Sequence, residues 1–120
     1  MSSRTDLVSE LMRNPKISEH AIQALKAYGW DCDEILVTVA KKNVLSVLAE
    51  FSAGQLTADE VQSWANRIEG RDDVDYEYGP DGVVNEVVFW LANPNINYPI
   101  NAALCDRIEK AFFDVEPTDL

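Results

Sequence analysis

Hydrophobic residues along this chain recur mostly three and four positions apart, which is the period of one face of an α-helix. The runs are bounded by residues that typically begin or end helices, such as Asn14-Pro15, Gly54 and Gly70. The pattern predicts an all-α protein, a compact bundle of about five to six short helices. The expected helical segments are 3–13, 18–29, 40–54, 57–70, 84–91 and 101–114.

The strongest local signal lies at the start of the segment 57–70. Thr57 and Glu60 have the spacing of a capping box, in which each side chain accepts a hydrogen bond from the backbone N–H of the other residue. Leu56 and Val61 flank them at the spacing of a hydrophobic staple. The segment is therefore predicted to be an amphipathic helix whose buried stripe is Val61, Trp64, Ala65 and Ile68.

Two stretches between the expected helices lack a helical period. Residues 34–39 are rich in β-branched side chains, and periodicity does not decide between an extended connector and a helical turn. Residues 71–78 are predicted to form an acidic loop between the fourth and fifth helices. A turn at Gly79-Pro80-Asp81-Gly82 follows this loop.

Length and charge limit the classes of partner. A chain of 120 residues with 47% hydrophobic content is expected to form one domain, residues 1–120. The formal net charge is −11, and the half from residue 61 onward carries four basic against twelve acidic residues. Such a surface repels phosphate, which argues against nucleic acid and anionic membranes as partners and favours a basic protein.

The sequence offers no recognisable catalytic or cofactor motif. Cys32 and Cys105 lie far apart without metal-ligand spacing, and His20 is the single histidine. There is no Gly-rich phosphate loop and no nucleophile elbow, so we expect no enzyme activity, no cofactor and no metal. The N-terminus lacks the apolar core of a signal peptide, and no stretch approaches the ~18 apolar residues of a membrane span. A cytoplasmic protein is expected.

The candidate binding residues cluster in the acidic loop. Four carboxylates there alternate with Val74 and two tyrosines, so in an extended segment the carboxylates and the apolar groups point to opposite sides. Tyrosines supply contact area and carboxylates pair with Lys or Arg, which suits an interface for a basic protein. The predicted partner-binding residues are Glu69, Asp72, Asp73, Asp75, Tyr76, Glu77 and Tyr78.

Three other interpretations of these residues remain open at this stage. The segment 71–78 fits equally well as a solvated loop pinned to the core by Val74 and Tyr76. Asp72, Asp73 and Asp75 suit a small metal-dependent enzyme, although the spacing is not that of a calcium loop. The chain also suits a homo-oligomeric structural or adaptor module, and the oligomeric state does not follow from the sequence.

The run LTADEVQSWANRIEGRDDV, residues 56–74, resembles a pattern found in small bacterial proteins that include immunity proteins of contact-dependent or polymorphic toxin systems. The resemblance covers roughly a sixth of the chain. It implies a cytoplasmic inhibitor that neutralises a basic toxin domain, such as a nuclease, by binding it directly and without turnover. No functional residue is carried over from the resemblance.

Overall fold

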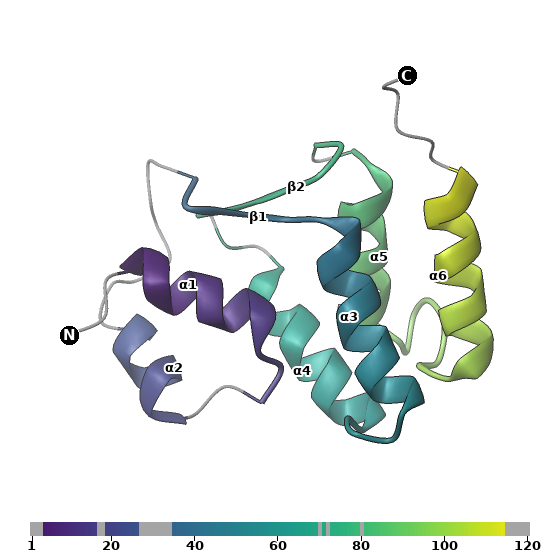
Figure 1. Cartoon of the computed structure of the whole chain (residues 1–120), viewed down its shortest axis with the longest axis horizontal. Helices are drawn as coiled ribbons and strands as arrows, with labels where there is room; N and C mark the ends of the chain where they lie inside the picture. The colour runs from purple at the N-terminus through teal and green to yellow at the C-terminus, as the bar shows by residue number, and fades with distance from the viewer. Residues whose placement is uncertain are drawn as a thin grey trace.

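Helices dominate the structure, as the sequence predicts. The computed structural model describes residues 4–16, 19–26, 35–69, 71, 73–79 and 81–114. In Figure 1, α1 and α2 lie on one side, α3, α5 and α6 on the other, and α4 between them. The helices are α1 (Arg4–Arg13), α2 (Glu19–Lys26), α3 (Lys41–Ser52), α4 (Ala58–Ile68), α5 (Val83–Ala92) and α6 (Ala102–Asp114).

The helix boundaries follow the expected caps where these are described. Asn101, the expected cap of the last helix, accepts a hydrogen bond at Oδ1 from the backbone N of Leu104 at 2.9 Å. The expected cap of the second helix at Ser18 and its expected end at Gly29 lie outside the described residues. The longest described helix, α6, has 13 residues. No helix in the described ranges is long and apolar enough to cross a membrane.

A pair of short parallel strands is the feature that the helical periodicity did not predict. β1 (Val37–Val39) pairs with β2 (Val74–Tyr76) in the register Val37 to Val74, Thr38 to Asp75 and Val39 to Tyr76. The undecided stretch 34–39 is thus extended from Val37 to Val39, and part of the predicted acidic loop is a strand. β-branched residues favour an extended backbone, but they form a strand only when a partner strand pairs with them. That partner is β2, which is far away in the sequence.

The two strands lie along one side of the molecule, between α1 and the pair α3 and α5 (Figure 1). Parallel strands need a crossover connection, and here α3 and α4 supply it (Figure 1). β1 leads into α3, and β2 leads through a turn into α5. Val39 and Val74 are buried against the core, whereas Thr38 on the opposite face is exposed. Within β2, Val74 is buried, whereas Asp75 and Tyr76 are both partly exposed.

α4 occupies the centre of the hydrophobic core. It packs most extensively against α5 and also contacts α1 and α3. The predicted stripe is buried throughout, and Trp64 is completely inaccessible to solvent. The indole Nε1 of Trp64 donates a hydrogen bond to the carbonyl of Met12 at 2.7 Å, which satisfies the one polar atom of this side chain inside the core.

The capping box predicted at the start of α4 is present in the structure. Thr57 Oγ1 accepts a hydrogen bond from Glu60 N at 3.1 Å, and Glu60 Oε1 accepts one from Thr57 N at 2.9 Å. Thr57→Ala removes one of these bonds and is expected to lower the free energy of unfolding by about 1 kcal/mol. Urea denaturation measures this loss. Thr57→Ser keeps the hydroxyl and is the control, and an equal loss in both variants would contradict the capping role.

Candidate functional site

Asp73 is buried, which corrects its interpretation as a partner-binding residue. Its side chain has 0% of its surface exposed, and the residue lies directly before β2. Arg4 Nε donates to Asp73 Oδ2 at 2.9 Å, and Arg71 donates through Nε to Oδ1 at 2.9 Å and through Nη2 to Oδ2 at 3.0 Å. Both carboxylate oxygens therefore bind arginines within the protein. Arg4 is 69 positions away, so no local pattern predicted this pairing.

The arginines keep Asp73 ionised inside the protein. Burial alone would raise the pKa of this carboxyl group, because a low-dielectric environment disfavours the charged form. The hydrogen bonds and positive charges of Arg71 and Arg4 outweigh burial and hold the pKa of Asp73 below its ordinary value. Because its oxygens accept arginine N–H groups, Asp73 does not offer the ligand that the metal-dependent alternative requires.

The carboxylate of Asp75 lies on the outer face of the strand pair. It is partly exposed, and its strand partner Thr38 is exposed on the same face. Asp75 Oδ1 accepts a hydrogen bond from the backbone N of Tyr76 at 2.8 Å, which turns the carboxylate toward its own strand. Asp75 therefore remains accessible to a partner, although one oxygen is already engaged.

Tyr76 packs against the hydrophobic core. Burial of its phenol, together with the nearby negative charges of Glu69 and Asp75, raises the pKa of Tyr76 to about 12. Glu69 follows the last residue of α4, so a carboxylate at the end of this helix contributes to the raised pKa of Tyr76. Tyr76 thus links two of the predicted carboxylates rather than standing out as an exposed anchor.

Glu77 and Tyr78 connect the end of β2 to the beginning of α3. Glu77 Oε1 accepts a hydrogen bond from the backbone N of Lys41, the first residue of α3, at 2.8 Å. A carboxylate in this position also complements the positive end of the helix dipole. The ammonium Nζ of Lys41 lies 5.6 Å from the centroid of the Tyr78 ring, within the range of a cation–π contact. Tyr78 is 39% exposed, so part of its ring remains accessible.

Glu69 belongs to an acidic groove between the end of α4 and the beginning of α5. The groove has a volume of about 410 Å³. Three carboxylates and an aromatic ring contribute to its walls, and its described lining residues are Glu69, Asp81, Gly82, Asn85, Glu86 and Phe89. None of these residues is basic. We call this set the acidic groove.

The backbone of the turn before α5 helps to shape the acidic groove. Tyr78 has a φ of 73° and Gly79 a φ of 84°, so the chain reverses in the left-handed region there. Gly82 follows so closely that an added Cβ would lie 2.6 Å from the Cβ of Tyr78. Only glycine fits so close to Tyr78. The close contact places Asp81 and the first turn of α5 next to the end of the acidic loop, residues 71–78.

Asp81, Glu86 and Phe89 were not predicted as binding residues from the sequence. The available signal was Phe89, which is 40% exposed although it lies in the most apolar helix of the chain. The buried stripe of α5 is Val84, Val87, Val88 and Leu91. Phe89 and Glu86 fall outside this stripe, three positions apart, so they share the outer face of α5.

Asp72 lies outside the described residues, so the structure does not place it. Of the remaining predicted residues, the structure buries Asp73, engages Glu77 in helix capping, and leaves Asp75 and Tyr78 partly accessible. Glu69 joins the acidic groove. Within the described ranges, no three His, Cys, Asp or Glu side chains converge in a way that could hold a metal ion.

The buried carboxylate predicts a large loss of stability when it is removed. Asp73→Ala leaves two arginines of low exposure without their shared counter-charge, so the free energy of unfolding at neutral pH is expected to fall by about 3–5 kcal/mol. Urea denaturation measures the change. Glu109→Ala, which removes an exposed carboxylate from α6, is the control and is expected to change stability by less than about 0.5 kcal/mol.

The pH dependence of this loss follows from the lowered pKa of Asp73. The stabilisation is fully present above the unfolded-state pKa of about 3.9, and it is lost as the pH falls through the lower pKa of the folded state. The difference in unfolding free energy between wild type and Asp73→Asn should therefore shrink below about pH 4. If the difference in unfolding free energy between wild type and Asp73→Asn stayed constant from pH 4 down to about pH 2, the ion pairing of Asp73 would be contradicted.

The proximity of Glu69 to Tyr76 is tested by titration. In Glu69→Gln the pKa of Tyr76 should fall from about 12 but stay above its ordinary value, because burial is the larger cause. Ultraviolet absorbance reports tyrosinate formation, and the Tyr76→Phe variant identifies the contribution of this residue. An unchanged pKa in Glu69→Gln would place Glu69 too far from the hydroxyl to share a site with it.

Comparisons with known proteins do not assign this site. A search of protein-family models, of curated proteins and of solved structures finds no match to the chain. The resemblance of residues 56–74 to immunity proteins therefore remains a prediction.

Proposed function

We propose that this chain is a non-catalytic protein-binding domain whose acidic groove receives basic side chains of a partner protein. The observation that carries this proposal is the composition of the groove. Glu69, Asp81 and Glu86 line one concave surface together with the exposed ring of Phe89, and no described lining residue is basic.

The groove has the chemical groups that bind Lys and Arg. Carboxylates accept charge-assisted hydrogen bonds from ammonium and guanidinium groups, and these bonds are roughly twice as strong as neutral ones. The face of an aromatic ring such as Phe89 attracts the same cations and covers their apolar stems. A volume of about 410 Å³ is small, so the groove suits one or two long side chains rather than a whole helix.

The charge of the whole chain supports fast association with a basic partner. The net charge of −11 creates a negative potential around the molecule, and complementary potentials raise association rates by about 10- to 1000-fold. Asp75 and Tyr78, which are accessible at and after the end of β2, add a carboxylate and an aromatic ring that a partner could contact. Glu77 is better assigned to holding this segment on α3.

We propose more specifically that the partner is a toxin domain and the chain is its immunity protein. A nuclease toxin must attract nucleic acid, so its positive surface also attracts an acidic inhibitor. The similarity of residues 56–74 to immunity proteins agrees with this form of the proposal, and that run includes Glu69 of the groove. Inhibition would result from direct binding, with the inhibitor unchanged.

The immunity form is tested with the genes next to that of this chain. A toxin domain encoded beside it should arrest growth when expressed alone and should be tolerated when this chain is co-expressed. The purified pair should form a stable complex by size-exclusion chromatography. Protection that persists without a complex would argue against inhibition by binding.

The role of the acidic groove is tested by charge reversal. Asp81→Lys/Glu86→Lys should slow association with the basic partner at least ten-fold at low salt, and added salt should narrow the difference because it screens the charges. Stopped-flow fluorescence or surface plasmon resonance measures both rate constants.

A matched variant separates the groove from the overall charge. Asp106→Lys/Glu109→Lys makes the same change in net charge on exposed positions of α6, and it should slow association less. If both double variants slowed association equally, the acidic groove would not be the binding site. The effect would then come from the net charge of the whole chain. Circular dichroism confirms that both variants keep their helical content.

A further inference from the structure

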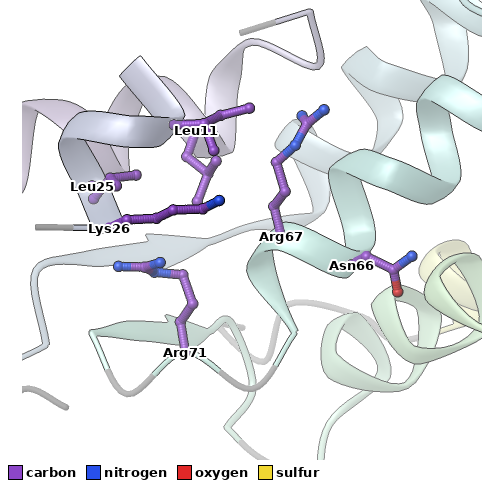
Figure 2. Close-up of a pocket in the computed structure, with 7 residues that line it drawn as sticks. Leu11, Leu25, Lys26, Asn66, Arg67 and Arg71 are labelled. Carbon is purple, nitrogen blue, oxygen red and sulfur yellow. The ribbon is translucent and has the colours of Figure 1, made fainter. Parts of the chain in front are cut away.

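The cavity drawn in Figure 2, between α1, α2 and α4, is shaped by contacts within the protein. Arg67 Nη1 donates to the carbonyl of Pro15 at 3.2 Å, and Arg71 Nε donates to Asp73 Oδ1 at 2.9 Å. These bonds hold the two guanidinium groups to different parts of the chain, so the cavity does not gather positive charge at one point. A larger concave surface, with a volume of about 850 Å³, lies between α3 and α6.

The concave surface between α3 and α6 is mainly apolar. α6 forms one edge of the molecule and packs against α3 and α5 (Figure 1). Leu48 and Phe112 belong to the hydrophobic core, and Leu45 packs against it, so these side chains form a firm base. The uncharged walls include Leu45, Leu48, Ala49, Ser52, Phe112 and Phe113. We call this set the apolar groove.

The apolar groove combines a hollow on one helix with a projecting ring on the other. Ala49 and Ser52 are exposed on α3, and because they are three positions apart they share one face of the helix. Their small side chains let another residue approach the helix closely. Phe113, near the end of α6, has 76% of its surface exposed, the largest exposed fraction among the described large hydrophobic residues. This ring therefore contributes little to the core of its own chain.

A surface that carries both a ring and a hollow is complementary to itself. In a dimer with a two-fold axis the same patch of each copy meets its counterpart, so every contact between two different residues is made twice. Phe113 of one copy can therefore pack on Ala49 and Ser52 of the other, and the reverse contact follows by symmetry. A second copy of this chain fits the shape of the apolar groove without any further component.

The charge of α3 and α6 also favours a second copy at this surface. Two chains of net charge −11 repel each other, and the repulsion is strongest where carboxylates outnumber basic residues. Across α3 and α6 the charges balance, with four basic residues (Lys41, Lys42, Arg107 and Lys110) and four acidic residues (Glu50, Asp106, Glu109 and Asp114). A second copy therefore meets the least repulsion here, whereas a basic partner gains no attraction from this surface.

We propose that the apolar groove is the contact surface of a symmetric homodimer, in which Phe113 of each copy occupies the groove of the other. The contact is apolar at its centre and balanced in charge around it. This proposal does not rest on the proposed protein-binding function, because the acidic groove and the apolar groove share no described lining residue.

The effect of salt distinguishes this dimer from association with a basic partner. Sedimentation equilibrium of the full chain should show monomer and dimer, and the Kd of the dimer should fall at least ten-fold between about 0.05 and 0.5 M sodium chloride. Salt screens the repulsion between the two acidic chains and leaves the apolar contact in place, whereas it weakens binding of a basic protein. A chain that stays monomeric throughout, or a dimer that weakens with added salt, would overturn the proposal.

Uncharged variants assign the dimer to the apolar groove. Phe113→Ser removes the projecting ring and should raise the Kd of the dimer at least ten-fold. Ile96→Ser removes a side chain of similar exposure, 73%, in the segment after α5 and should leave the Kd unchanged. Ala49→Trp fills the hollow on α3 and should weaken the dimer as well.

Circular dichroism checks that the three variants keep their helical content. An equal rise of the Kd in Phe113→Ser and Ile96→Ser would show association through any exposed apolar side chain and would overturn the site. An unchanged Kd in Ala49→Trp would also overturn it, because the ring would then not occupy the hollow.

Discussion

The ionised Asp73 inside the protein is the interaction on which the arrangement of the described elements depends. Its side chain binds Arg4 of α1 and Arg71 beyond α4, and its backbone carbonyl accepts a hydrogen bond from the N of Leu36 at 2.8 Å, just before β1. One residue thus joins the first helix, the end of the central helix and the strand pair. A buried charge needs this complete set of partners, because an unpaired charge in the interior costs several kcal/mol.

The Asp73 pairing and the acidic groove are separate clusters of charged side chains. Asp73 binds Arg4 of α1 and Arg71 within the protein. The acidic groove forms at the end of α4 and along the outer face of α5, with no basic residue among its described walls. The net charge of −11 alone therefore does not show where the carboxylates gather.

Local patterns were sufficient to predict the helices but not the contacts between distant segments. The cap at Thr57 and the stripe around Trp64 depend on spacings of a few residues, and both are confirmed. The pairing of β1 with β2 and the binding of Arg4 to Asp73 join residues that are far apart in sequence, where periodicity carries no information. For this reason Glu69 was identified as part of an acidic site, whereas its neighbours Asp81 and Glu86 were not.

The hydrogen bond between Glu77 and the first amide of α3 constrains how the acidic segment can respond to a partner. If this segment moved away from α3, the helix would lose both its capping acceptor and a favourable charge at its positive end. Docking without rearrangement avoids that loss. The end of β2 and α3 should therefore move as one body, and a partner would meet a surface whose shape is set before the encounter.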